Sequence, residues 1–180
     1  MDLGSIIKDI PDFPKPGIIF RDVMPILANP GALKEVLDRI YMEWIQDENA
    51  PIIHAIAGLE ARGFLFGSPL ATDLFLPFVP IRKKGKLPGK VIQQSYDLEY
   101  GSDTIEIQEG ALPEGARVLV IDDLLATGGT AAAACALIEK AGAEVVGCAF
   151  IVELASLNGR SKLAGRKIQS LKIYEEELIC

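Results

Sequence analysis

The chain has 180 residues, with 18 lysines and arginines against 25 aspartates and glutamates, so its formal net charge is −7. A chain of this length can form one domain with a full hydrophobic core. The acidic balance disfavours a nucleic-acid partner, because the phosphate backbone would be repelled. We therefore expect a single domain over residues 1–180 and no nucleic-acid partner.

The cysteines and the single histidine limit the classes of site that are possible. Cys135, Cys148 and Cys180 are scattered and form no CxxC pair, which is typical of reduced thiols in a cytoplasmic protein. No signal-peptide pattern and no run of 18 apolar residues is present, so we expect no membrane span. With His54 alone, a multi-histidine metal site lacks its ligands, and we expect His54 to be structural, on or near a buried strand.

The first fifty residues predict a rigid loop, a short strand and a long helix. Residues 10–17 hold three prolines and a glycine, which indicates an irregular and fairly rigid loop. Residues 18–22 alone would be interpreted as a small edge strand. Asn29 and Pro30 suit a helix start, and apolar residues then follow with helical spacing as far as Ile45.

Alternating apolar runs and helical segments predict an α/β fold. We assign strands to residues 52–57, 78–82, 117–121, 144–152 and 168–174. Helices between parallel strands imply right-handed crossovers, so the expected fold is a doubly wound, mainly parallel five-stranded sheet. Roughly alternating residues between 83 and 108 predict a flexible β-hairpin that projects from this sheet.

The segment VLVIDDLLATGGT, residues 118–130, is the most informative motif. A buried strand ends at Asp122 and Asp123, and the sequence Ala126-Thr127-Gly128-Gly129-Thr130 then opens a helix. Ligands of open α/β sheets bind at the carboxyl ends of the strands. A helix N-terminus supplies free N–H donors, which favour a phosphate. The segment therefore predicts a phosphate cradle, although two glycines alone would fit a surface turn equally well.

The paired carboxylates decide which phosphate ligand fits. Asp122 and Asp123 would repel a bare phosphate, but carboxylates accept hydrogen bonds from vicinal hydroxyls and are ligands that Mg²⁺ prefers. No lysine follows the glycines, and G-x-G-x-x-G is absent, so neither a P-loop nor a dinucleotide fingerprint is present. The motif favours a ribose 5-phosphate.

Two further segments could bind anions. Arg62 lies in a glycine-bounded loop, residues 58–63, between a strand and a helix, and a guanidinium can bind phosphate oxygens in a bidentate way. The alternative for Arg62 is a surface ion pair. Basic residues also cluster between Arg82 and Lys90, which suits a small anionic substrate, although a solvated charge run is the alternative.

The segment VLVIDDLLATGGT resembles the motif that binds phosphoribosyl pyrophosphate (PRPP) in type I phosphoribosyltransferases. The resemblance runs from residue 10 to about Gly159 and is strongest to the members that act on adenine. It implies a purine-salvage transferase that converts adenine and PRPP to AMP and pyrophosphate. It also implies Mg²⁺ bound through PRPP without a dedicated protein ligand cluster, a homodimer, and a base-binding hood over residues 1–30.

The resemblance also implies roles for individual residues. The catalytic residues would be Glu99, Asp122 and Asp123. The 5-phosphate would bind to Ala126, Thr127, Gly128, Gly129 and Thr130. The pyrophosphate would bind to Glu60, Ala61, Arg62, Arg82 and Lys86, with a cis peptide bond between Glu60 and Ala61. Adenine would contact Ile19, Phe20, Arg21, Leu124 and Leu154. Tyr100 would lie in the substrate-covering loop, although spacing alone would place Glu99 and Tyr100 in an exposed hairpin turn.

Three alternatives remain open at this point. The first is a phosphoribosyltransferase for another purine base, such as xanthine. The second is a PRPP-sensing regulator without catalysis, which the acidic net charge and the intact Arg62 loop disfavour. The third is a plain nucleotide-binding or structural domain, for which the additional loops would have no purpose.

Overall fold

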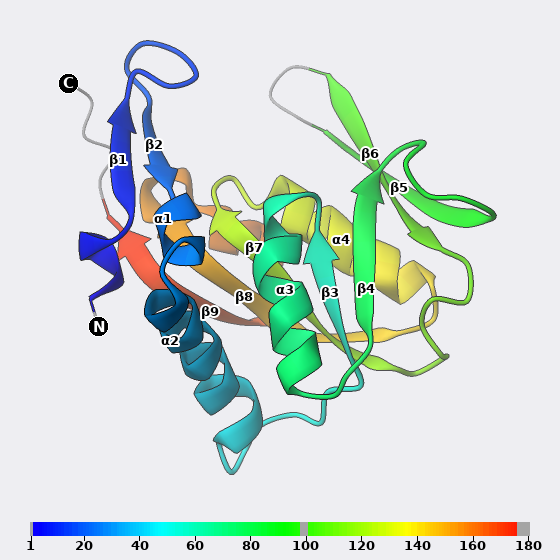
Figure 1. The fold of residues 1–180 in the computed structure, drawn as a ribbon. Coiled ribbons are helices and arrows are strands. Elements are labelled where there is room, and N and C mark those ends of the chain that lie inside the picture. The colour runs from blue at the N-terminus through cyan, green and yellow to red at the C-terminus, as the bar shows by residue number, and fades with distance from the viewer. Residues whose placement is uncertain (1, 98–100, 176–180) are drawn as a thin grey trace.

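The computed structural model describes residues 2–97 and 101–175, and a mixed seven-stranded sheet forms its centre (Figure 1). The strand order is β5-β6-β4-β3-β7-β8-β9. The strands are β3 (Ala55–Leu59), β4 (Phe78–Lys83), β5 (Val91–Asp97), β6 (Ser102–Gln108), β7 (Arg117–Leu125), β8 (Glu144–Leu154) and β9 (Lys167–Tyr174). The strands β4, β3, β7, β8 and β9 are parallel, which confirms the α/β fold class.

The predicted number of five strands is wrong, because the hairpin joins the sheet. β6 pairs antiparallel with the end of β4, where Arg82 faces Glu106 and Lys83 faces Ile105. β5 then pairs with β6 along its whole length. An unpaired edge of β4 would leave its backbone groups without partners, and β6 supplies them. Residues 98–100 of the predicted loop lie outside the described residues.

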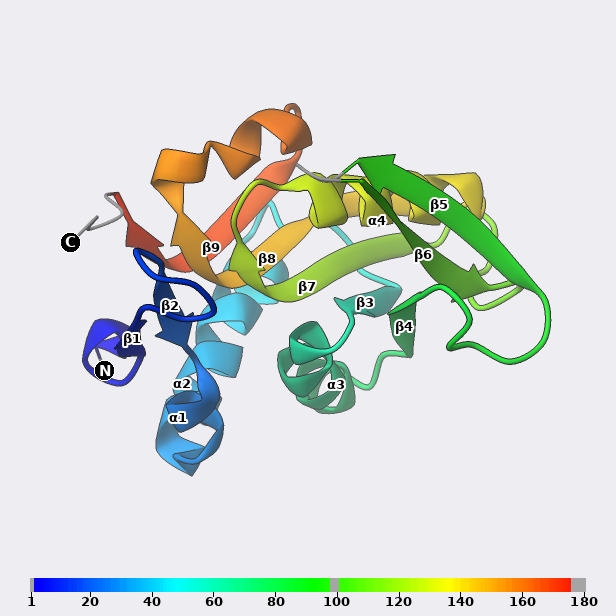
Figure 2. The same ribbon diagram turned by 90° about the horizontal axis from the view of Figure 1, so that it is seen from above.

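Helices cover both faces of the sheet, as Figure 2 shows from above. α4 (Gly129–Lys140) lies on one face, while α2 (Pro30–Tyr41) and α3 (Arg62–Asp73) lie on the other. Side chains of β7 alternate between the two cores: Val118 and Val120 pack towards α4, and Leu119 and Ile121 towards α2 and α3. None of the described helices is long and apolar enough to cross a membrane.

The predicted helix start at Asn29 is confirmed. The Asn29 side chain accepts hydrogen bonds from the N–H groups of Gly31 and Ala32, and Pro30 occupies the first helical turn. After α2 the chain continues as the π-helical turn η2 (Met42–Gln46). There Trp44 is fully buried, and its indole N–H donates to Gln169 Oε1 at 2.8 Å. This bond ties the end of the helix to β9.

The N-terminal segment forms a small sheet of its own. After the 3₁₀ turn η1 (Leu3–Ser5), β1 (Lys8–Pro11) pairs antiparallel with β2 (Ile19–Asp22), and the short helix α1 (Met24–Leu27) follows. The first residues of the predicted irregular loop therefore belong to β1. The guanidinium of Arg21 lies 4.0 Å above the ring of Tyr174 in β9, so this small sheet is held next to the carboxyl end of β9.

The strand predicted from residue 52 begins at Ala55 instead. Ile52 is 66% exposed, and His54 is exposed as well. The Nδ1 atom of His54 accepts the N–H of Arg117 at 3.1 Å, and the His54 N–H donates to the Arg117 carbonyl. His54 thus has the structural role that was predicted, just before the buried strand β3.

Candidate active site

The candidate site lies at the carboxyl ends of the parallel strands. β7 is longer than predicted: its pairing with β3 ends at Gly58 and Ile121, but its pairing with β8 continues to Leu125 and Glu153. Residues 122–125 therefore extend beyond the part of β7 that pairs with β3. This is the edge at which open α/β sheets bind ligands.

The phosphate cradle forms at the start of α4. Gly128 has φ of +75° and immediately precedes the helix, a conformation that glycine adopts without steric cost. A Cβ atom placed on Gly128 would lie 2.3 Å from the carbonyl oxygen of Gly159, and one on Gly159 would lie 2.2 Å from the carbonyl oxygen of Ala126. The cradle is therefore packed directly against η4 (Gly159–Leu163), which begins at Gly159.

A cavity of 210 Å³ brings the predicted ribose and phosphate groups together. Its lining consists of Arg62 and the continuous segment 122–131. The cavity holds both carboxylates, the cradle and one cation. These groups were predicted separately from two motifs that lie 60 residues apart in the sequence, and the structure places them around one space.

The two carboxylates lie close together in different surroundings. Asp123 is 3% exposed, and its Oδ2 atom lies 2.9 Å from Nε of Arg62. Its backbone N–H donates to Oδ1 of Asp122 at 2.9 Å. Burial raises the pKa of Asp122, and the neighbouring Asp123 raises that pKa further. Burial also raises the pKa of Asp123, although Arg62 acts in the opposite direction. The pair is thus short of positive charge.

Arg62 connects the carboxylates with the N-terminal sheet. Its guanidinium carbon lies 5.2 Å from the centre of the Phe20 ring, while its Nε binds Asp123. Arg62 opens α3, and the next residue, Gly63, packs on β7: a Cβ atom there would lie 2.7 Å from the Ile121 carbonyl oxygen. The peptide bond between Glu60 and Ala61 is cis, which confirms the prediction.

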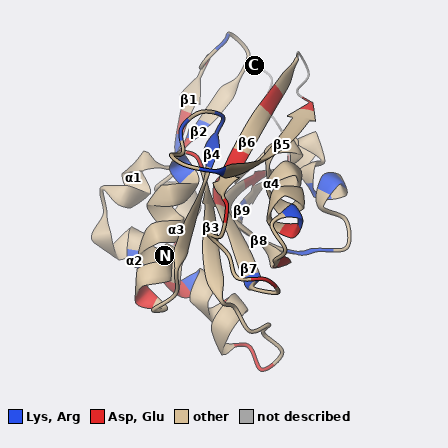
Figure 3. Ribbon diagram, turned by 90° about the vertical axis from the view of Figure 1, so that its right-hand side faces the viewer, with Lys and Arg blue, Asp and Glu red and all other residues tan. Residues whose placement is uncertain are grey.

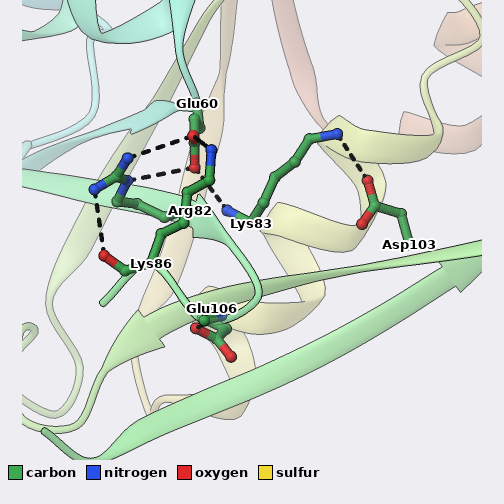
Figure 4. A network of polar contacts seen from close by, with 7 residues as sticks. Glu60, Arg82, Lys83, Lys86, Asp103 and Glu106 are labelled. Atoms are coloured by element: carbon green, nitrogen blue, oxygen red, sulfur yellow. Dashed lines mark hydrogen bonds and ion pairs between the residues drawn. The ribbon is translucent and has the colours of Figure 1, made fainter. Parts of the chain in front are cut away.

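The predicted pyrophosphate residues Glu60, Arg82 and Lys86 form one cluster (Figure 4). Glu60 Oε1 lies 2.5 Å from Lys86 Nζ, and Glu60 Oε2 lies 3.3 Å from Arg82 Nε. The Lys83 N–H also donates to Glu60 Oε2 at 2.8 Å. Burial opposes ionisation, but hydrogen bonds from Lys86, Lys83 and Arg82 lower the pKa of Glu60 to about 2. Figure 3 shows the basic residues along the loop that follows β4.

The predicted base-binding residues lie on two sides of this region. Ile19 and Phe20 are partly exposed in β2, and Phe20 packs edge-on against Phe13 with ring centres 5.2 Å apart. Leu124 and Leu154 are partly buried in the α2–α3 core. The side chain of Arg21 is turned to Asp9 and Tyr174. Glu99 and Tyr100 lie outside the described residues.

Two residues beside the cradle were missed. The Thr130 hydroxyl lies 3.3 Å from the hydroxyl of Tyr96 in β5. The Lys162 ammonium in η4 lies 3.7 Å from the position of a Cβ atom on Gly129. The motif contains no signal for Lys162, because its position depends on the packing of Gly159 against Gly128. Tyr96 occurs in an alternating strand, which could have predicted its face but not its partner.

Comparisons with known proteins identify the family. A family model described as phosphoribosyl transferase domain matches residues 25–173. An adenine phosphoribosyltransferase of Methylococcus capsulatus is 52% identical over 172 residues, which cover 96% of this chain and 98% of that protein. The crystal structure of an adenine phosphoribosyltransferase from Thermoanaerobacter pseudethanolicus aligns with a TM-score of 0.89 at 44% identity and covers 96% of this chain and 98% of that chain.

A second solved structure adds ligands to the comparison. The adenine phosphoribosyltransferase of Saccharomyces cerevisiae, solved with an imino-altritol bisphosphate and adenine, aligns with a TM-score of 0.89 at 43% identity. The alignment covers 94% of this chain and 96% of that chain. Sequence and structure agree over nearly the whole length, and the chain therefore belongs to the phosphoribosyltransferase family, among the adenine phosphoribosyltransferases.

Proposed function

We propose that this chain transfers the 5-phosphoribosyl group of PRPP to adenine and releases AMP and pyrophosphate. The observation that carries the proposal is the cavity in which the Asp122–Asp123 pair, the N-terminus of α4 and Arg62 meet. A ribose phosphate ester has a complementary arrangement of two hydroxyls, a 5-phosphate and a second anionic group. The relatives named adenine phosphoribosyltransferase support adenine as the acceptor.

The sugar would bind between the carboxylates and the cradle. Among the described residues that line the cavity, Arg62 is the one cation for the two acidic groups of the carboxylate pair. Ribose hydroxyls would donate hydrogen bonds to the pair and so stabilise its ionised form. The free N–H groups at the start of α4 would hold the 5-phosphate. Because both ends of the sugar are then fixed, C1 is held in position before the reaction, which reduces the entropic cost of the transition state.

The reaction would break the bond between C1 and the pyrophosphate oxygen. The bonding electron pair leaves with pyrophosphate, positive charge develops on the ribose ring, and a nitrogen of adenine forms the new bond to C1. Arg62, Arg82 and Lys86 would neutralise the leaving group, while the aspartates would face the cationic ring. Adenine loses a proton in this step, and Glu99 remains our proposed acceptor.

The residues present fit a metal ion that arrives with the substrate. The described residues contain no group of three or more His, Cys, Asp and Glu side chains that could hold an ion by themselves. Mg²⁺ commonly binds through one or two carboxylates together with substrate phosphates and water. We propose that Asp122 and Asp123 face such an ion, which would supply charge neutralisation at the leaving pyrophosphate.

The choice of base would depend on the backbone of β2. Ile19 and Arg21 are two residues apart in this strand, so the Ile19 carbonyl and the Arg21 N–H point to the same side. We propose that they pair with the amino group and the adjacent ring nitrogen of adenine. A 6-oxopurine presents the reversed pattern and would leave two groups unpaired, which can discriminate by roughly 10⁴-fold. Phe20 and Leu154 would pack on the ring.

Pyrophosphate release tests the proposal. Purified protein is mixed with PRPP and Mg²⁺, and then with adenine, hypoxanthine, guanine or xanthine in separate reactions. We expect release with adenine alone among the four bases. Faster release with a 6-oxopurine would identify a different base specificity. Binding of PRPP without release for any base would instead support a sensing protein and contradict the enzymatic assignment.

We also propose that the enzyme acts as a homodimer in the cytoplasm. Large apolar side chains are exposed on the side of α2 and α3, among them Phe75 at 96% and Met42 at 56%, and a second copy would cover such residues. The buried thiols of Cys135 and Cys148 are free at a sulfur–sulfur distance of 3.7 Å, which suits a reducing compartment. Light scattering of the purified chain tests the dimer.

A further inference from the structure

A buried carboxylate lies next to the phosphate cradle without lining the cavity. Glu153 is buried at the end of β8, where it pairs in the sheet with Leu125, the residue before the cradle segment 126–130. Its two oxygens accept hydrogen bonds from Arg160 in η4: Nε donates to Oε1 and Nη2 donates to Oε2, each at 2.7 Å. A bidentate pair of this kind fixes both the distance and the orientation of its two groups. It therefore fastens η4 to the end of β8.

Glu153 is held in its ionised form although it is buried. Burial raises the pKa of this carboxyl group, but hydrogen bonds from Arg160 and Ser170 outweigh burial, so the pKa is lowered overall. The side chain of Glu153 is 5% exposed, whereas that of Arg160 is 44% exposed. A buried charge is costly when its partner is removed. Loss of the Arg160 guanidinium would therefore release η4 and leave this carboxylate without its main donor.

Gly159, which precedes Arg160 in the chain, makes the contact with the cradle. A Cβ atom on Gly159 would lie 2.2 Å from the carbonyl oxygen of Ala126 and 3.1 Å from the nitrogen of Gly128. In the opposite direction, a Cβ atom on Gly128 would lie 2.3 Å from the Gly159 carbonyl oxygen. The two backbones thus touch with no side chain between them. A shift of η4 would consequently shift the peptide groups that open α4.

The turn before η4 directs the chain into this position. Asn158 has φ of +52°, and its carbonyl oxygen accepts the N–H of Ser161 at 3.1 Å and the hydroxyl of Ser161 at 2.7 Å. The same segment places the Lys162 ammonium 3.7 Å from the position of a Cβ atom on Gly129. Figure 2 shows this segment in orange, on the same side of the sheet as α4. η4 therefore supplies both a wall of the cradle and a cation beside the helix start.

We propose that Glu153 and Arg160 are positioning residues that hold η4 against the cradle and so fix the N–H groups of α4 and the Lys162 ammonium that would bind the 5-phosphate. The inference rests on the proposed function, because it takes the cradle as a phosphate site. Neither Glu153 nor Arg160 is among the described residues that line the cavity. Both therefore act on the ligand through η4, by way of Gly159 and Lys162.

Ligand binding to variants of Arg160 tests the inference. The affinity for ribose 5-phosphate is measured by calorimetry, and that for Mg²⁺-pyrophosphate in separate titrations. Arg160→Met removes both hydrogen bonds to Glu153, and we expect ribose 5-phosphate binding to weaken roughly three- to tenfold, the range for one lost hydrogen bond to the ligand. Pyrophosphate affinity should stay unchanged. Arg166→Met is the matched control, because it breaks an ion pair with Glu139 at the other end of α4 and should change neither affinity.

Two further variants separate positioning from charge. Glu153→Gln removes a negative charge near the cradle, so a purely electrostatic influence would tighten ribose 5-phosphate binding. A glutamine accepts only one of the two bonds from Arg160 and turns an amino group towards the other donor, so positioning predicts weaker binding. Arg160→Lys keeps the charge but loses the bidentate geometry. Positioning predicts an affinity between those of the wild type and Arg160→Met, whereas charge alone predicts the wild-type affinity.

The outcomes distinguish the inference from the proposed function. Wild-type affinity for ribose 5-phosphate in Arg160→Met or Arg160→Lys, tighter binding in Glu153→Gln, or equal losses for both ligands would overturn the inference and leave the proposed function intact. If Glu153→Gln does not fold, Arg160→Lys decides between positioning and charge. A wild-type protein that binds no ribose 5-phosphate and releases no pyrophosphate would overturn both.

Discussion

The candidate site contains two clusters of charged residues with opposite balances. In the Asp122–Asp123 cluster two carboxylates share Arg62, and burial raises the pKa of both acids. In the Glu60 cluster one carboxylate has two basic partners, and its pKa falls to about 2. The two clusters differ in their cations and hydrogen bonds, because Arg62 serves two buried acids whereas Lys86, Lys83 and Arg82 all donate to Glu60. The carboxylates of the first cluster lack hydrogen-bond donors, which a ligand could supply. Glu60 in the second cluster already has its donors within the protein.

This contrast indicates different tasks for the two clusters. An ionised, fully paired Glu60 stabilises the arrangement of Arg82 and Lys86 before substrate arrives. The aspartate pair gains its missing donors only when a polyol binds. Replacing the acids of the first cluster should therefore reduce function without reducing stability, whereas replacing Glu60 should reduce stability.

The largest effect is expected for the aspartates. Asp122→Asn and Asp123→Asn keep side-chain size but remove charge, and we expect kcat/KM for PRPP to fall roughly 10- to 150-fold, as for hydrogen bonds to a charged group. Initial rates at subsaturating PRPP measure this. Turnover near that of the wild type would show that Asp122 and Asp123 do not bind the sugar.

Asp122→Asn should at the same time stabilise the folded protein when no ligand is added. The pKa of Asp122 is raised on folding, so its ionised form destabilises the folded state at neutral pH. The free-energy contribution of the Asp122 carboxyl group favours folding below the pKa that this group has in the unfolded chain. This contribution is lost as pH rises through the pKa of Asp122 in the folded protein. We expect Tm to rise by roughly 2–4 °C at pH 7, with a smaller gain as pH approaches 4. A lower Tm at pH 7 would contradict the assigned charge balance.

A further test removes the cation shared by the aspartates. Arg62→Ala should raise KM for PRPP about tenfold, since one charged contact to the anion is lost, and barely change KM for adenine. Arg166→Ala provides a matched control, because Arg166 pairs with Glu139 on α4. Equal changes for both substrates would assign Arg62 to the scaffold.

Glu60→Gln tests whether the charge of Glu60 stabilises the second cluster. Because the folded pKa of Glu60 lies at about 2, below its ordinary 4.5, its stabilisation is present above pH 4.5 and disappears as pH falls towards 2. We expect a loss of roughly 2–4 °C in Tm at pH 7, and convergence with the wild type as pH falls to about 2. Glu139→Gln, in a single exposed ion pair, should change Tm less. A pH-independent difference would contradict the role of the charge.

The smallest effect is expected at Lys162. Its ammonium lies beside Gly129, and we expect Lys162→Met to raise KM for PRPP roughly two- to fivefold through a lost exposed charge. Lys162→Arg should retain the wild-type value. The difference between the two variants should shrink at high salt, because exposed charges are screened. An equal rise of KM in Lys162→Met and Lys162→Arg would show that the packing of the Lys162 side chain, and not its charge, causes the effect.

Local patterns predicted the fold and much of the site, and long-range packing explains the remainder. The cradle and the carboxylates are contiguous in residues 118–130, so their proximity follows from one strand–helix unit. The hairpin was predicted as a projection, because pairing of β6 with the end of β4 has no local signal. The pairing of Arg62 with Asp123, and the contacts of Tyr96 and Lys162 with the cradle, join distant segments.

Ribose 5-phosphate binding is the most direct test of the central claim that the Asp122–Asp123 cluster and the cradle form one sugar-phosphate site. Calorimetry compares the wild type with Asp122→Asn, Asp123→Asn and Glu60→Gln. The charge balance predicts that both aspartate variants lose at least tenfold in affinity while remaining folded, and that Glu60→Gln binds like the wild type. Wild-type affinity in both aspartate variants would contradict the claim.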